Sequence, residues 1–269
     1  MKYLAFSIVF ALQYKVEVYS QNVCGARMAA LSGSALTQAD AFAGFHNFSA
    51  NASKNSNSFA IYGQNPYGMT DIKDAGAAIS MHFGTGVMGV VCQSYGNVEF
   101  NRKRMNFGYA LPLSDKFSAS ASLGFSSTRI SNGYGRSSTF WTNVGATYSV
   151  RKDWKWAAVA DVPMRSLKNE EDLSASIRLG TTYSFGEQVH LSAQLNSTSS
   201  HVSSLTYSFG VEYFPVEIFA VRLGMNTFWQ TWSLGFGTHL KNYSFDASAV
   251  LHPQLGITPQ ISFVYGMEK

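Results

Sequence analysis

The sequence predicts an all-β chain: a transmembrane, antiparallel, up-and-down β-barrel of about fourteen strands with an N-terminal plug segment. Three observations predict this class. Only 13% of the 269 residues are charged, yet the mean hydropathy is close to zero at −0.04. After the first dozen residues, no apolar run approaches the roughly 20 residues that a membrane helix needs. Instead, strand-length segments alternate between apolar and polar residues, as barrel strands do between lipid and lumen.

The alternation is clearest in the segment LSASIRLGTTYSF, residues 173–185. One face of this segment is Leu, Ala, Ile, Leu, Tyr and Phe, and the other is Ser, Arg, Gly and Thr. A soluble β-sandwich also has one apolar face per strand, but its strands are usually shorter and its outer faces more charged. We therefore expect the apolar face to contact lipid. The sheet should close, because an open edge in hydrocarbon leaves backbone groups without hydrogen bonds.

Residues 1–20 are predicted to be a signal peptide. Lys2 supplies the positive start, Leu4 to Leu12 form a short apolar stretch, and Val18 and Ser20 give a cleavage site before Gln21. The alternative is a hydrophobic first strand, but the stretch LAFSIVFAL does not alternate. Export through the inner membrane to the cell outer membrane is the expected localisation.

Residues 21–56 are predicted to be an N-terminal plug, or hatch, folded back into the lumen of a barrel formed by residues 57–269. The segment is rich in Ala, Gly and Ser and lacks a period of two. Met28, Leu31, Ala35 and Ala39 could line a short helix. A disordered leader is the alternative.

Fourteen alternating segments follow, each of roughly the length that a tilted membrane strand needs. They are predicted at residues 57–64, 73–83, 86–96, 100–112, 116–130, 138–150, 154–165, 172–185, 188–197, 202–214, 217–228, 230–240, 242–252 and 255–267.

The connections between these segments alternate between two kinds. One kind is tight and polar, such as FGTG and LSDK, and the other is mostly longer, such as NPYGMTD and RSLKNEED. Short periplasmic turns and longer outer loops are typical of outer-membrane barrels. Aromatic residues cluster beside the tight turns and predict a girdle at the membrane surface: Phe117, Tyr148, Trp154, Trp156, Tyr183, Phe185, Tyr213, Phe214, Phe219 and Tyr243.

Charged residues of both signs are predicted to point into the lumen. Mixed charges in a lumen usually pair with one another or with a plug, so ion-pair scaffolding is expected; a selectivity constriction is the alternative. The alternation assigns to this set Arg104, Lys155, Asp161, Arg178, Glu212, Arg222, Asp246 and His239.

No enzymatic or metal-binding motif accompanies this pattern. The six histidines are scattered, and no nucleophile elbow, zinc-protease motif or phosphate-binding loop is present. The two cysteines, Cys24 and Cys92, lack metal-type spacing, and whether they pair is open. The net charge of +4 is too small and dispersed to indicate a nucleic-acid partner. The sequence therefore predicts no catalytic residue, no cofactor and no metal; an outer-membrane phospholipase is a distant alternative.

The N-terminal residues resemble a known family. The order GAR-x-AAL-x-G, then Ala-Asp, then Phe-His-Asn resembles the start of the long-chain fatty-acid transporter-like barrels. It is most similar to the PorV/PorQ-type proteins of the type IX secretion system of Bacteroidota. The stretches at 133–146 and 252–265 look like a small uncharacterised branch of these barrels. The matching plug-motif residues are Gly25, Ala26, Arg27, Ala30, Leu31, Gly33, Ala39, Asp40 and Asn47.

This resemblance implies a non-enzymatic accessory or scaffold subunit in protein secretion or outer-membrane assembly. Its partners would be outer-membrane lipid and other outer-membrane or secretion proteins. The alternative is a channel or transporter for small hydrophobic molecules. The family's Asn-Pro-Ala is replaced here by Asn47-Phe48-Ser49, and the chain is shorter than a typical transporter, so both departures weaken the transport alternative.

Overall fold

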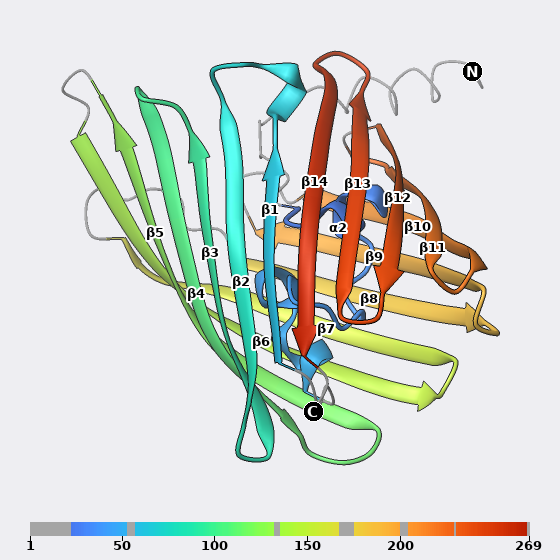
Figure 1. The fold of residues 1–269 in the computed structure, drawn as a ribbon. Coiled ribbons are helices and arrows are strands. Elements are labelled where there is room, and N and C mark those ends of the chain that lie inside the picture. Colours follow the sequence, from blue (N-terminus) through green and yellow to red (C-terminus); the bar gives the residue numbers. More distant parts are fainter. Residues whose placement is uncertain are drawn as a thin grey trace, which may run out of the picture.

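The computed structural model describes residues 23–52, 57–131, 135–166, 175–199, 204–228 and 230–267. Fourteen antiparallel strands form a closed barrel, in which each strand pairs with its neighbours in sequence. The ring closes between the first and last strands, where Asn57 lies opposite Met267 and Gln64 opposite Gln260 (Figure 1). The predicted fold class is therefore confirmed. The predicted signal peptide, residues 1–20, lies outside the described residues.

In the connections that the structure describes, the only helical element between strands is one 3-10 turn, η2 (Pro66–Gly68). Their bounds are β1 Asn57–Gln64, β2 Lys73–Phe83, β3 Gly86–Gly96, β4 Phe100–Pro112, β5 Phe117–Ile130, β6 Gly135–Arg151, β7 Trp154–Ser166, β8 Ala175–Phe185, β9 Val189–Ser199, β10 Ser204–Val216, β11 Phe219–Asn226, β12 Thr231–Leu240, β13 Tyr243–His252 and β14 Gly256–Met267.

The outer wall is apolar and the inner wall is polar, as the alternation predicts. In β11, Arg222 is fully buried on the inner face, whereas its neighbour Leu223 is 59% exposed on the outer face. Exposed Leu, Ile, Phe or Val side chains recur on every strand except β3, whose exposed residues are Cys92 and Ser94. A soluble monomer rarely exposes a continuous apolar surface of this kind. Lipid is the solvent that matches such a wall.

Most of the predicted girdle residues lie near the tight turns, but Phe214 does not face outward. Its ring packs against His190 and His239, at centroid distances of 5.4 and 6.0 Å. This inward position follows the alternation along β10, because Glu212 is buried on the inner face and Tyr213 is 45% exposed on the outer face. The girdle prediction for Phe214 rests on its place beside a tight turn, which does not decide the face.

The two cysteines do not form a disulfide, and no described helix could cross a membrane. Cys24 is buried and Cys92 is exposed, and both are free thiols, so they do not pair. No helix among the described residues is long and apolar enough to span a membrane.

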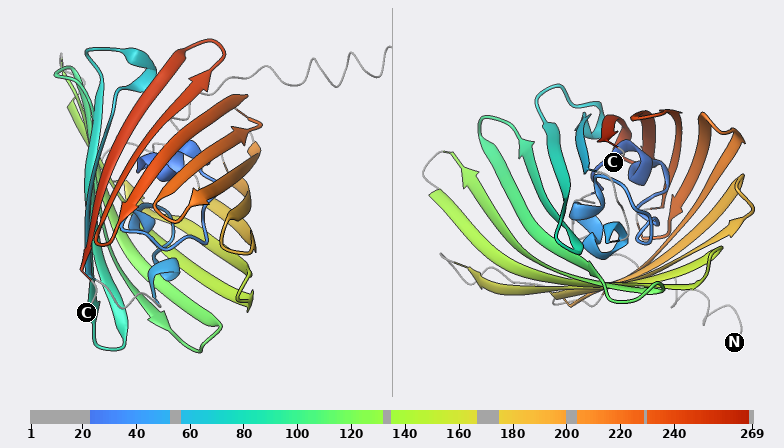
Figure 2. Two further views of the ribbon diagram at one scale, coloured as in Figure 1. Left: turned by 45° about the vertical axis from the view of Figure 1, so that its right-hand side comes forward. Right: turned by 60° about the horizontal axis from the view of Figure 1, so that its bottom comes forward.

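The barrel encloses residues 23–52, which we call the lumen segment. It contains two short helices, α2 (Ala26–Ala30) and α3 (Ala43–His46), and a 3-10 turn, η1 (Phe48–Asn51). The helix α2 lies against β11 to β14, and η1 lies against β4 to β6 (Figure 2). The segment therefore crosses the lumen from one side of the wall to the other before β1 begins.

Candidate functional site: the segment inside the lumen

Glycines set the path of the lumen segment. Gly25 precedes α2 with a φ of 94°, and Gly33 follows it with a φ of 77°, both in the left-handed region that favours glycine. The amide of Gly33 donates to the carbonyl of Met28, which caps the end of the helix. The helix therefore ends at Ala30 and does not continue to Ala35 or Ala39 as the spacing suggested. The side chains of Met28, Leu31 and Ala35 nevertheless form one buried cluster.

Wall glycines create the space that the segment occupies. A Cβ added at Gly108 would lie 2.5 Å from the Phe48 ring, and one added at Gly180 would lie 2.8 Å from Leu36. At Gly224 it would meet the backbone of Leu31 at 2.6 Å. Contacts of this kind occur beneath the segment at Gly89, Gly108, Gly145, Gly180, Gly210, Gly224 and Gly235. The wall and the segment are thus complementary in shape around much of the barrel.

Hydroxyl groups join the segment to the wall between these glycines. Ser32 contacts Ser233 and Ser34 contacts Ser192, each with an Oγ–Oγ distance of 2.7 Å. Thr37 donates to Thr182 at 2.6 Å. These pairs satisfy polar groups that would be costly to bury alone.

Asn47, one of the predicted motif residues, organises the end of the segment near the tight turns. Its amide nitrogen donates to the carbonyl of Leu36 and to the Thr147 hydroxyl, both at 3.0 Å. Its side-chain oxygen accepts from Ser49, the residue that replaces alanine in the family pattern. Hydrogen bonds therefore shape this turn where the family has a proline.

An ion network links the segment to the wall. Arg27 donates two hydrogen bonds to Glu212, at 2.9 and 2.7 Å. Glu212 also accepts from Arg222 at 2.6 Å, and Arg222 donates to Asp246 at 2.7 Å. The side chains of Glu212 and Arg222 are fully buried. Two cations and two anions balance, so every charge of this network has a partner of opposite sign.

The other predicted lumen charges lie apart from this network. Asp161 and Arg178 form their own ion pair at 2.9 Å. Arg104 makes no ion pair or hydrogen bond with any residue that the structure describes. Six of the eight residues predicted to point into the lumen therefore divide into a triad held by Arg27 (Glu212, Arg222 and Asp246), the Asp161–Arg178 pair and the single cation Arg104. His239 lies beside the triad, with its Nε2 3.4 Å from Arg222.

A further polar cluster was missed by the sequence reasoning. The Tyr62 hydroxyl donates to Asp74 at 3.0 Å and contacts the Cys24 sulfur at 3.2 Å. Gln93 and Gln64 donate to the same carboxylate. The alternation in β2 could have placed Asp74 inside the barrel, because Ala78 and Ser80 share its face.

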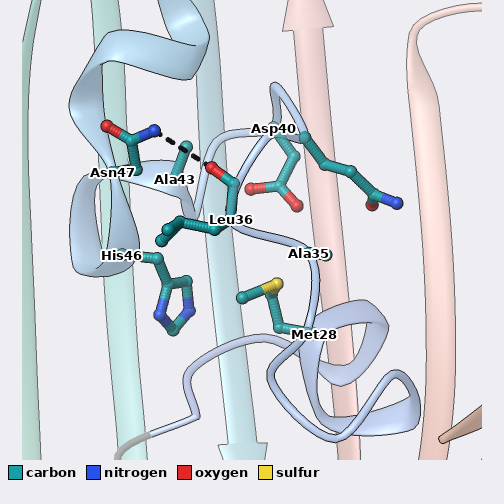
Figure 3. A pocket seen from close by; sticks show the side chains of 8 residues that line it. Met28, Ala35, Leu36, Asp40, Ala43, His46 and Asn47 are labelled. Atoms are coloured by element: carbon teal, nitrogen blue, oxygen red, sulfur yellow. Dashed lines mark hydrogen bonds between the residues drawn. The ribbon is translucent and has the colours of Figure 1, made fainter. Parts of the chain in front are cut away.

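A small gap remains within the segment itself (Figure 3). It is too small to hold a water molecule. Asp40 lies at its edge, and the backbone carbonyl of Asp40 accepts from Asn51 at 2.7 Å. The lining residues are Met28, Ala35, Leu36, Gln38, Asp40, Ala43, His46 and Asn47. Within the described ranges, no group of His, Cys, Asp or Glu is arranged to hold a metal ion.

No protein-family model and no curated protein matches the chain. Solved structures with the same fold do match. The Pseudomonas putida toluene transporter TodX aligns with a TM-score of 0.70 at 12% identity over 93% of this chain and 99% of that one. The Ralstonia pickettii toluene transporter TbuX has a TM-score of 0.63 at 12% identity, covering 92% and 98%. A Pseudomonas aeruginosa FadL homologue has a TM-score of 0.66 at 11% identity, covering 91% and 98%.

At this level of identity the likeness shows a shared fold. The chain therefore has the barrel fold of FadL-type outer-membrane transporters. The expected secretion or assembly role, and the PorV/PorQ and Bacteroidota assignments, rest only on the sequence resemblance.

Proposed function

We propose that the barrel is a non-enzymatic outer-membrane channel for small hydrophobic molecules and that the lumen segment is its gate. One observation carries this proposal. Every backbone-to-backbone hydrogen bond of residues 25–52 that the structure describes lies within the segment. The wall contacts it through side chains, as at Ser32, Asn106 and Ser118. The segment can therefore move without breaking the sheet.

The surface beneath the segment supports an apolar cargo. Ala60, Ala78 and Val91 form one buried patch on β1 to β3, and Ala157 and Val159 form another on β7. Most other inward residues are Ser, Thr, Asn or Gln. Displacement of the segment would expose these patches to the lumen, where they could contact a small apolar molecule such as toluene, the substrate named for two proteins with this fold.

A disulfide between segment and wall tests the proposal. The Oγ atoms of Ser32 and Ser233 are 2.7 Å apart, close enough for a cysteine pair to form with little movement. The variant is Ser32→Cys/Ser233→Cys in a Cys24→Ala/Cys92→Ser background. Uptake of radiolabelled toluene is measured in cells that carry the barrel in their outer membrane.

We expect the oxidised variant to take up toluene no faster than cells without the barrel, because the segment cannot leave. Reduction of the disulfide should restore uptake, and each single-cysteine variant should be unaffected by oxidant. Equal uptake by the oxidised and reduced forms would show that the segment is not a gate.

A further inference from the structure

The outer wall carries a basic patch at one end of the barrel. Lys103 of β4, Arg129 of β5 and Arg136 of β6 are all exposed. Arg129 and Arg136 lie directly opposite each other, and Lys103 lies opposite Ser127, two residues from Arg129. We call Lys103, Arg129 and Arg136 the basic patch. The ends of β4 and β5 lie side by side at the upper left of Figure 1.

The patch faces away from the lumen. The β4–β5 and β5–β6 ladders have no register shift between the patch and the apolar residues of the wall. Lys103 therefore shares a face with Met105 and Phe107, which are 49% and 46% exposed. Arg129 likewise shares a face with Leu123, which is 61% exposed.

Along the barrel axis, the basic patch lies where the apolar band that contacts lipid should end. Phe117 and Tyr148, at the tight-turn end, mark the other edge of the apolar band. Ser127 is ten residues beyond Phe117 on β5, which corresponds to about 24 Å along the membrane normal at a tilt of about 45°. The apolar band of an outer-membrane barrel is about 25 Å tall. Lys103 lies at the level of Ser127 and the two arginines lie just beyond it, at the level of lipid headgroups.

The charges of the patch are not compensated by the protein. None of the three residues forms an ion pair with any residue that the structure describes. Like charges directly opposite each other on neighbouring strands are destabilising. Among the contacts described, the only side-chain hydrogen bond of the patch goes from Arg136 Nε to the Ser127 hydroxyl at 2.6 Å. Terminal guanidinium nitrogens and the Lys103 ammonium are thus left to bind an anion.

The tight-turn end of the barrel has no comparable excess of positive charge. The tight turns and the residues beside them carry four acidic and four basic residues: Asp115, Lys116, Arg151, Lys152, Asp153, Glu187, Glu217 and Lys241. Basic side chains beside a membrane surface attract anionic headgroups, and arginine binds phosphate in a bidentate manner.

We propose that the basic patch binds the phosphate groups of an anionic lipid in the leaflet at the longer-loop end of the barrel. The lipid's acyl chains would lie along the apolar wall formed by Met105, Phe107 and Leu123. This site is independent of the gate, although it requires that the barrel lies in a membrane.

Native mass spectrometry of the purified barrel tests the proposal, with phosphorylated lipid A and its phosphate-free analogue as probes. The test variant is Lys103→Ser/Arg129→Ser/Arg136→Ser. The matched control removes three cations at the other end, Lys116→Ser/Arg151→Ser/Lys152→Ser. We expect retention of lipid A to fall about tenfold or more in the test variant, because it loses three basic side chains that attract anionic headgroups, and to be unchanged in the control.

A second variant separates binding from folding. Arg129→Glu places a carboxylate opposite Arg136, so the barrel should keep its heat-modifiable electrophoretic mobility while losing lipid A. The proposal would be overturned if the test variant retained as much lipid A as the parent protein. It would also be overturned if the parent protein retained the phosphate-free analogue as well as it retains lipid A. So would displacement of lipid A by equimolar inorganic phosphate, which indicates a simple anion site. Retention of polyglutamate without lipid A would assign the patch to a protein partner. None of these substitutions changes the lumen segment, so each variant should take up toluene at the rate of the parent protein.

Discussion

At the scale of single residues, Arg27 is the charged link between the lumen segment and the wall. Among the described residues, replacing Arg27 with Met leaves Arg222 as the only ion-pair partner of Glu212 and Asp246. Removing one partner of a buried ion pair costs about 3–5 kcal/mol. Because Arg27 is 21% exposed, we expect the lower end of this range, with the segment displaced more often.

Cys24 reports this displacement. Burial raises the pKa of its thiol to about 12, so it reacts slowly while the segment is in place. In a Cys92→Ser background, Arg27→Met should accelerate maleimide labelling of Cys24 by about tenfold or more. Arg178→Met, which breaks the separate pair with Asp161, is the control and should have a much smaller effect. Equal rates in the two variants would remove Arg27 from its proposed role.

His46 makes the segment sensitive to acid. Burial lowers its pKa to about 4, although the ring also contacts the Cys24 carbonyl at 3.1 Å. The pKa is lower in the folded than in the unfolded state, so the stabilisation is complete above about 6.5 and is lost as the pH falls towards 4. The loss reaches about 3 kcal/mol. Channel openings in a planar bilayer should be more frequent at pH 5 than at pH 7, and His46→Gln should abolish the difference. Openings that depend on pH equally in both proteins would exclude His46 as the cause.

At the scale of elements, the wall glycines are the feature on which docking of the segment depends. Gly224→Val places a side chain against the backbone of Leu31 and Ser32, which cannot move aside by changing rotamer. Overpacking of this kind costs about 1–3 kcal/mol, so Cys24 labelling should be faster than in the parent. Gly63→Val is the matched control, since no atom lies within 4 Å of an added Cβ there. A Gly224→Val protein that labels no faster than Gly63→Val would contradict the fit.

The strands were predictable from the sequence because alternation is a local property. The strand predicted at 86–96 has the observed bounds of β3, and the one predicted at 138–150 is observed as Gly135–Arg151. The partners inside the lumen were not predictable in the same way. Arg27 and Glu212 are 185 residues apart, and alternation gives the direction of a side chain but not its neighbour. Phe214 shows the limit of using aromatic clustering alone, because it lies beside a tight turn but shares the inner face with Glu212.

At the scale of the whole molecule, the barrel separates two tasks. The outer wall matches lipid, and in the proposed lipid site it also binds a headgroup. The inner wall holds a segment that fills the lumen through glycine recesses, hydroxyl pairs and one ion network. Because the segment adds no strand to the sheet, the barrel should fold without it.

Ion conductance after deletion of residues 23–52 tests the central claim most directly. The full chain and the deletion variant are compared in planar bilayers, after both have shown the heat-modifiable mobility of a folded barrel. The account predicts that the full chain is mostly closed and that the deletion variant conducts continuously. A folded deletion variant that conducts no more than the full chain would contradict it.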